Sequence, residues 1–132
     1  MIHSQDLCFL VSGRFTSKDI QNLHILKKKF PDSQIILSTW EDDFGRLKEE
    51  EKDTIADLNL EIVLTKDPNS EVRDVFTGRC INYIRQISSF TSAIQSNNRK
   101  YVMKLRSDLY FKDDKFLQKK ELRNDLDQDK II

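Results

Sequence analysis

The stretch Asp6-Leu-Cys-Phe-Leu-Val-Ser12 contains a short, uninterrupted apolar run that ends before Gly13. Its length suits a β-strand that is buried on both faces, as strands are in a parallel sheet. Residues 16–30 follow with apolar side chains at helical spacing, and Pro31 stops the pattern. A buried strand followed by an amphipathic helix is the first unit of an α/β domain.

Further along the chain, strand-like and helical patterns alternate. Residues 39–45 are expected to form a loop, and residues 46–58 carry a weak helical signal. Residues 80–94 give the clearest helix, because their apolar side chains fall on one wide face. A second buried strand is predicted at residues 34–38, and two further strands are predicted at residues 60–65 and 101–106. This alternation predicts a three-layer α/β fold with a mainly parallel sheet and flanking helices, which is a Rossmann-like arrangement.

The composition is that of a globular domain with a strongly charged surface. The 132 residues are 38% hydrophobic and 33% charged, and 22 basic residues balance 22 acidic ones. A net charge of zero argues against nucleic-acid binding, which usually needs an uncompensated basic patch. No apolar run approaches the ~20 residues of a membrane-spanning helix, and the first residues lack the basic segment of a signal peptide. We therefore expect a cytoplasmic protein.

Several familiar site types are not supported by the sequence. Cys8 and Cys80 lie far apart in apolar surroundings, which predicts buried reduced thiols rather than a disulfide. His3 and His24 do not combine with them in any zinc-binding spacing. No Walker A, GxGxxG or GxSxG motif is present, which disfavours a P-loop NTPase, a dinucleotide oxidoreductase and a serine hydrolase.

Polar and charged residues follow the carboxyl ends of all four predicted strands. In an open parallel sheet these ends lie at one edge, and ligands bind in the crevice outside that edge. The four strand ends are Ser12-Gly13-Arg14, Ser38-Thr39-Trp40-Glu41-Asp42, Thr65-Lys66-Asp67 and Arg106-Ser107-Asp108.

Among the strand-end residues, Asp108 is the clearest candidate for a metal ligand. A carboxylate is a hard oxygen ligand, which suits Mg2+ or Mn2+ that bridges a diphosphate and offsets charge on a departing nucleotide. Arg106 lies on the same side of the extended segment, where it could contact a phosphate or pair with Asp108. In the alternative interpretation Asp108 caps a turn and Arg106 forms an ion pair, and the spacing favours neither.

Six other residues are candidates for contact with a nucleotide or sugar. Four of them have a structural alternative that is at least as well supported: the tryptophan as a packing residue, the aspartate before Pro68 as part of a turn, and the two helix residues as a solvated face. The six are Trp40, Glu41, Asp42, Asp67, Asn82 and Arg85.

Five segments, spread over about residues 7–111, occur in a recognisable order. They are Phe9-Leu-Val-Ser-Gly13, Phe30-Pro-Asp-Ser-Gln-Ile-Ile-Leu-Ser-Thr-Trp-Glu41, Lys66-Asp-Pro68, Asn82-Tyr-Ile-Arg-Gln86 and Tyr101-Val-Met-Lys-Leu-Arg-Ser-Asp108. Together they resemble the WavE lipopolysaccharide synthesis family, a group of glycosyltransferases with a GT-A-like fold. The resemblance implies a transferase that uses a nucleotide-sugar donor and a glycan or lipopolysaccharide core as acceptor, in the cytoplasm or peripherally at the inner membrane.

The resemblance also implies roles for particular residues. Asp108 matches the carboxylate of the family's Arg-(Ser/Thr)-Asp element, which is similar to the metal-binding DxD motif but has Arg106 in the first position. Because a guanidinium could replace part of the cation's role, dependence on Mg2+ or Mn2+ is an open expectation. Gly13 matches the loop that receives the nucleotide, where the family's usual proline is replaced by Arg14.

The domain organisation implied by the resemblance is a donor-binding half domain over residues 1–111 and a charged tail over residues 112–132, which could form a helix. The chain ends soon after Asp108. We therefore expect a truncated enzyme, or a remnant or split subunit whose missing half comes from a protein partner. A non-catalytic α/β interaction module, with an open sheet edge and an uncovered apolar face, is the alternative, and a flavodoxin-like module is a weaker one.

Overall fold

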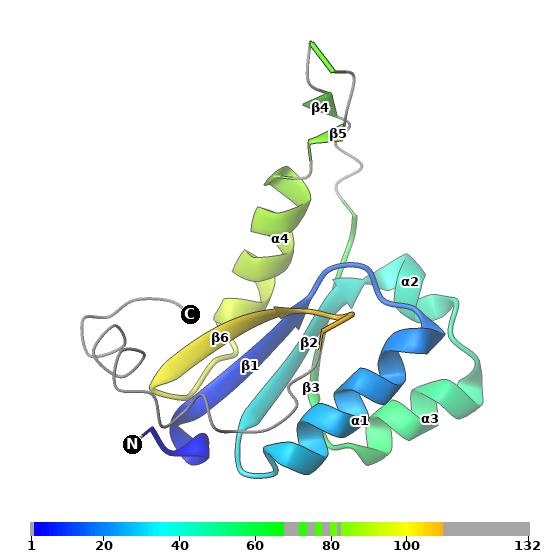
Figure 1. The fold of residues 1–132 in the computed structure, drawn as a ribbon. Coiled ribbons are helices and arrows are strands. Elements are labelled where there is room, and N and C mark those ends of the chain that lie inside the picture. The colour runs from blue at the N-terminus through cyan, green and yellow to red at the C-terminus, as the bar shows by residue number, and fades with distance from the viewer. Residues whose placement is uncertain (1, 68–71, 74–75, 78–79, 82, 110–132) are drawn as a thin grey trace.

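The computed structural model describes residues 2–67, 72–73, 76–77, 80–81 and 83–109. Its main feature is a four-stranded parallel sheet (Figure 1), which confirms the predicted α/β class. In spatial order the strands are β3 (Glu61–Thr65), β2 (Gln34–Trp40), β1 (Leu7–Ser12) and β6 (Tyr101–Arg106). A separate antiparallel pair is formed by β4 (Val72–Arg73) and β5 (Cys80–Ile81).

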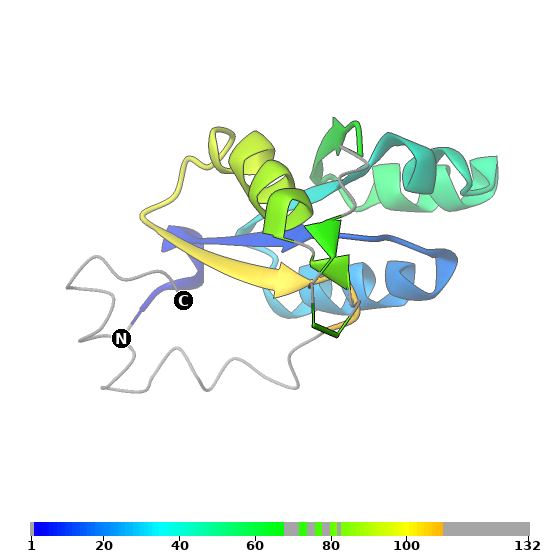
Figure 2. The same ribbon diagram turned by 90° about the horizontal axis from the view of Figure 1, so that it is seen from above.

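Helices flank the sheet on both faces. Figure 2 shows α1 and α4 on opposite sides of it. Within the described part of the chain, no helix is long and apolar enough to cross a membrane. The helical segments are η1 (Ser4–Asp6), η2 (Ser17–Asp19), α1 (Ile20–Lys29), α2 (Glu41–Gly45), α3 (Glu49–Asp57) and α4 (Tyr83–Ile94).

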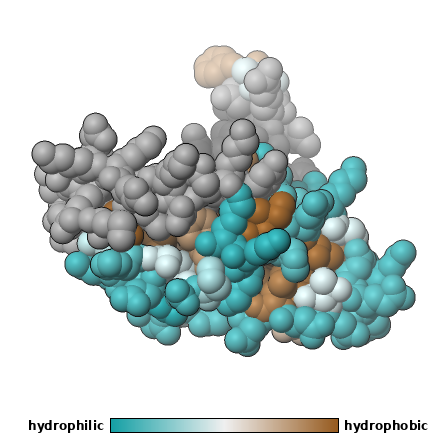
Figure 3. Space-filling model, turned by 60° about the horizontal axis from the view of Figure 1, so that its bottom comes forward, coloured by the Kyte–Doolittle hydropathy of each residue, from teal (hydrophilic) through white to brown (hydrophobic). Residues whose placement is uncertain are grey.

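β1 is the centre of the hydrophobic core, because its alternate side chains enter two separate clusters. Leu7, Phe9 and Val11 pack with residues of α1 and α3, whereas Cys8 and Leu10 pack on the opposite face with residues of α4. Every residue of β1 and of β2 is buried. This explains why both strands appear in the sequence as continuous apolar runs rather than as alternating patterns. Hydrophilic residues dominate the surface seen in Figure 3, around a smaller hydrophobic area.

Two predictions of local structure were wrong. Residues 39–45 are not a loop, because β2 continues to Trp40 and α2 follows directly. The last two residues of β2 pair with Leu64 and Thr65 of β3, a contact that local sequence does not reveal. The helix expected over residues 80–94 begins only at Tyr83, since Cys80 belongs to β5. The predicted tail, residues 112–132, lies outside the described residues.

The amino ends of the strands are joined by side-chain hydrogen bonds. Gln34, at the start of β2 and 7% exposed, donates from Nε2 to Glu61 Oε1 at 2.7 Å and to the Ser96 carbonyl at 2.8 Å. Its Oε1 accepts the backbone N–H of Asn98 at 3.0 Å. One buried amide thus links β2, β3 and the α4–β6 connection, so this edge of the sheet has a structural role.

The Cys8 thiol is predicted to be unreactive while the protein is folded. Burial is the main cause that raises the pKa of Cys8 from 9.0 to about 12, with a further increase from Glu61 and a smaller opposing effect of Arg99. In a Cys80→Ser variant at about pH 8, we expect a thiol reagent to label Cys8 only as fast as the chain unfolds. Rapid labelling before unfolding, with the denatured variant as the reference rate, would contradict this.

The same shift predicts a pH dependence of stability. Because the folded state holds the Cys8 proton more tightly than the unfolded state, the contribution to stability is complete below pH 9.0 and is lost as the pH rises toward about 12. Denaturant titrations over this alkaline range measure the free energy of unfolding at each pH. We expect it to decline less with rising pH in Cys8→Ala than in the parent chain.

Candidate functional site

The path of the chain creates a switch point between β1 and β6. From β1 the chain moves outward through α1 to β2 and through α3 to β3. It then returns through α4, on the opposite face, to β6 on the other side of β1 (Figures 1 and 2). Where connections diverge to opposite faces, a crevice forms outside the carboxyl ends of the two strands, and ligands of open α/β sheets bind there.

Several residues singled out from the sequence lie at this switch point. Ser12, the last residue of β1, lies opposite Arg106, the last residue of β6. The hydroxyl of Ser107 donates a hydrogen bond to the Arg14 carbonyl at 2.5 Å. Asn22 of α1 also donates from Nδ2 to the Ser107 carbonyl at 3.1 Å. The two strand ends are therefore fastened to each other and to the first helix.

Gly13 has the backbone conformation that lets the chain turn out of β1. Its φ is +112°, a value that side chains with a Cβ rarely adopt. Its N–H donates to the Ser38 carbonyl at 3.2 Å, and its own carbonyl accepts the Thr39 hydroxyl at 2.9 Å. A Cβ at this position would meet nothing within 4 Å. The glycine is therefore required by conformation and not by crowding, and it leaves open space at the strand end.

Arg106 and Asp108 form an ion pair that remains exposed. Arg106 Nη2 lies 2.7 Å from Asp108 Oδ2, and 76% and 53% of the respective side chains are exposed. Exposed pairs of this kind contribute only about 0–1 kcal/mol to stability. The ion pair that the sequence allowed is therefore present. Both charged groups nevertheless remain exposed at the edge of the sheet.

The groups around Asp108 are a poor match for a divalent cation. Mg2+ and Mn2+ favour several oxygen ligands, whereas one of the two Asp108 oxygens already accepts from a guanidinium. In the described ranges, no three or more His, Cys, Asp or Glu side chains are placed to hold a metal ion together. Binding of Mg2+ or Mn2+ at Asp108 therefore stays a prediction.

The other predicted residues lie at different distances from the switch point along the same edge. Trp40, at the end of β2, is 5% exposed and is packed in the interior. Glu41 and Asp42 begin α2 and are exposed, and Asp67 follows β3 and is partly buried. Asn82 lies outside the described residues, and Arg85 lies in α4 with a side chain that is not described. The described residues that converge at the switch point are Gly13, Arg14, Arg106 and Asp108.

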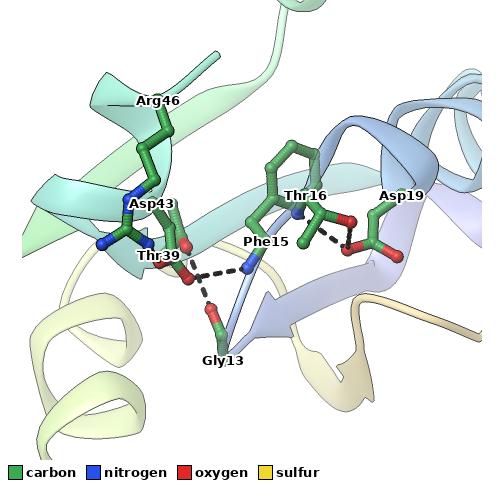
Figure 4. A network of polar contacts seen from close by, with 7 residues as sticks. All are labelled: Gly13, Phe15, Thr16, Asp19, Thr39, Asp43 and Arg46. Carbon is green, nitrogen blue, oxygen red and sulfur yellow. Dashed lines mark hydrogen bonds and ion pairs between the residues drawn. The ribbon is translucent and has the colours of Figure 1, made fainter.

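Sequence reasoning missed Asp43, which organises the loop after β1. Asp43 is 8% exposed, and its Oδ2 accepts the backbone N–H of Phe15 at 3.0 Å (Figure 4). Its Oδ1 accepts from Arg46 Nη1 at 3.2 Å. In the sequence it is the last of three consecutive acids, and nothing local distinguishes it from the other two. The signal appears only when residues 41–45 are assigned to a helix, which places successive side chains in different directions.

The loop then passes directly into the first helical segment. The backbone N–H of Thr16 donates to Asp19 Oδ2 at 2.9 Å, and the Thr16 hydroxyl lies 3.3 Å from the same oxygen (Figure 4). Thr16 and Asp19 occupy the two positions of a capping box, in which the side chain of the later residue accepts a free backbone N–H at a helix start. Residues 13–19 are consequently held at both ends, and Arg14 is presented from an ordered segment.

A groove of about 500 Å3 beside α1 and α3 is a weaker candidate for an anionic ligand. The pKa of Glu51 is lowered, first by a hydrogen bond from the Lys48 backbone and then by the Ser17 hydroxyl, so this carboxylate is ionised at neutral pH. A negatively charged wall repels phosphate. The described residues that line the groove include no lysine or arginine: they are Ser17, Ile20, Gln21, His24, Glu50, Glu51 and Thr54.

Comparison with known proteins identifies one family. The family model described as WavE lipopolysaccharide synthesis matches residues 11–131, which is nearly the whole chain. No curated protein and no solved structure matches. The match includes the strand ends at residues 12–14 and 106–108, so the switch point lies inside the shared region.

Proposed function

Because the chain belongs to the WavE lipopolysaccharide synthesis family, we propose that it binds a nucleotide-sugar donor for glycosyl transfer. Family membership indicates a role in lipopolysaccharide synthesis. The observation that carries the finer proposal is the switch point between β1 and β6, where the exposed Arg106–Asp108 pair adjoins the Gly13–Arg14 turn. Nucleotides bind at such switch points in open α/β sheets.

In this proposal the donor lies across the carboxyl edge of the sheet. The diphosphate faces the switch point, where Gly13 leaves room for close approach and charged side chains are available. The exposed carboxylates of Glu41 and Asp42, at the end of the neighbouring strand, are suitable acceptors for hydroxyl groups of the ribose or the sugar. Trp40 supports this edge by packing rather than by stacking on a base, because it is 5% exposed.

The acceptor and the location complete the proposal. The proposed acceptor is a lipopolysaccharide core or another surface glycan, and the proposed location is the cytoplasm, at or near the inner membrane. Membership of a lipopolysaccharide synthesis family supports the proposed acceptor. A protein partner that contributes the acceptor-binding surface is part of the same proposal.

Calorimetric titration with UDP-, GDP- and CDP-sugars tests donor binding. We expect one nucleotide class to bind, in Mn2+ or in EDTA, and the Asp108→Ala variant to bind at least about tenfold more weakly, since it loses the carboxylate that would hold a bridging cation or pair with Arg106, whose hydrogen bonds to a charged phosphate contribute about 1.5–3 kcal/mol. Asp57→Asn is the matched control, because Asp57 is an exposed acid at the end of α3 that leads toward the amino end of β3. No heat with any donor, or equal binding by Asp108→Ala, would rule out the proposal.

A second candidate function, a non-catalytic module that docks onto a partner protein, is favoured by β3. This strand lies at the edge of the sheet, and Ile62 and Leu64 are 36% and 42% exposed. Exposed apolar side chains on an edge strand are a common route to protein association. Sedimentation distinguishes the two functions: a monomer that binds a nucleotide sugar supports the transferase, whereas a chain that associates through β3 and binds no donor supports the docking module.

A further inference from the structure

We propose that the diphosphate of the donor is held by two guanidinium groups, those of Arg14 and Arg106, and that Asp108 positions Arg106 instead of ligating a metal ion. This inference deepens the proposed function and rests on it. It departs from the expectation that Asp108 works through Mg2+ or Mn2+. Three features support it: the place of the two arginines, the local charge and the geometry of the ion pair.

The two arginines flank the same hydrogen bond. Ser107, which donates to the Arg14 carbonyl at 2.5 Å, is the next residue after Arg106. The side chain of Arg14 is exposed, and 76% of the Arg106 side chain is exposed. Both backbones are held at the switch point, one by the strand β6 and the other by the turn at Gly13. Two long cationic side chains therefore leave adjacent, ordered positions at the switch point.

The local charge favours binding of an anion over binding of a metal cation. Lys104 lies on the same face of β6 as Arg106, because side chains alternate along a strand, and it is exposed. Residues 13–14 and 104–108 carry three positive charges, on Arg14, Lys104 and Arg106, and one negative charge, on Asp108. At the two strand ends of the switch point this excess of two positive charges favours a diphosphate over Mg2+ or Mn2+, whereas the carboxylates of Glu41 and Asp42 lie at the end of the neighbouring strand β2.

The ion pair leaves most of the guanidinium available. A guanidinium has five N–H donors, and the bond from Arg106 Nη2 to Asp108 Oδ2 at 2.7 Å uses one of them. The remaining donors can engage phosphate oxygens in the bidentate manner typical of arginine. The carboxylate limits the orientations of the long Arg106 side chain before the ligand arrives, so less conformational entropy is lost on binding. Asp108 is thus a positioning residue.

Titrations with inorganic pyrophosphate and with UDP, GDP and CDP in EDTA test this inference on the full chain. We expect a nucleoside diphosphate to bind without a divalent cation, and to bind at least about tenfold more weakly in Arg106→Gln and in Arg14→Gln. Asp108→Asn should weaken binding less than Arg106→Gln does. Asp57→Asn should leave it unchanged, and circular dichroism of every variant should match the parent chain.

A double-mutant cycle separates positioning from direct ligation. If Asp108 acts through Arg106, adding Asp108→Asn to Arg106→Gln causes no further loss of affinity, and Arg106→Lys retains more affinity than Arg106→Gln. Binding that disappears in EDTA and returns with Mn2+, or independent effects of Asp108→Asn and Arg106→Gln, would overturn the inference while leaving donor binding intact. Metal-free binding of pyrophosphate through both arginines, with no binding of any nucleotide sugar, would support the anion site. It would contradict the proposal that the ligand is a glycosyl donor.

Discussion

Replacing Phe9 with alanine is expected to lower the free energy of unfolding by about 3–5 kcal/mol, which is the usual cost of removing a buried aromatic ring. Phe9 lies in the central strand β1 and is 0% exposed. Its ring packs against that of Phe30, with centroids 4.7 Å apart and planes inclined by 51°. The cavity would open between the sheet and α1, where neighbouring strands and helices prevent the backbone from collapsing into it. Urea or thermal unfolding measures the loss.

Phe76→Ala is the matched control for this experiment. The chemical change is the same, but Phe76 is 97% exposed, so we expect a change within about 0.5 kcal/mol. A Phe9→Ala variant that is as stable as Phe76→Ala would mean that β1 is not the centre of the core. It would also remove the support for the switch point, whose position depends on β1 lying between β2 and β6.

Replacing Asp43 with alanine is expected to cost about 2–3 kcal/mol of stability, because it leaves a buried donor without its acceptor. The backbone N–H of Phe15 is bonded to Asp43 Oδ2, and Phe15 is 2% exposed, so water would not readily replace the carboxylate. Asp43→Asn should cost less, since its amide oxygen can still accept this hydrogen bond. Denaturant unfolding of the three chains gives the comparison.

Asp42→Ala is the control for Asp43→Ala, because Asp42 is an acid one position earlier in the same helix, and it is exposed. We expect Asp42→Ala to alter stability by less than about 0.5 kcal/mol. Asp43→Ala should also weaken donor binding, since Phe15 follows Arg14 directly and anchors the loop that presents it. Equal stability of the two alanine variants would show that the contact between Asp43 and Phe15 is dispensable.

The strands were predictable because burial on both faces leaves a local mark in the sequence. β1 and β2 are covered by helices on two sides, so every position along them favours an apolar or neutral residue, and the runs stand out without any knowledge of the fold. α2 was not predictable in the same way. Its five residues include three acids, and its position follows from the pairing of Trp40 with Thr65 and from the bond between Asp43 and Phe15.

The candidate site could be located from the sequence only as a set of strand ends. Parallel strands were enough to predict that Gly13, Arg14, Arg106 and Asp108 share one edge of the sheet. The spacing of Arg106 and Asp108 allowed either an ion pair or separate contacts with a ligand, because alternation sets the side of the strand and not the rotamers. The structure resolves that alternative with a contact of 2.7 Å.

Local sequence by itself determined the order of the four sheet strands along the chain and the burial of the central ones, because each strand leaves its pattern within a few neighbouring residues. Tertiary structure alone decided that β6 adjoins β1, that Ser107 is bonded to Arg14, and which of three consecutive acids turns inward. These outcomes depend on pairing between segments more than 20 residues apart, whose free energy comes from shared burial and hydrogen bonding that no local pattern of side chains records.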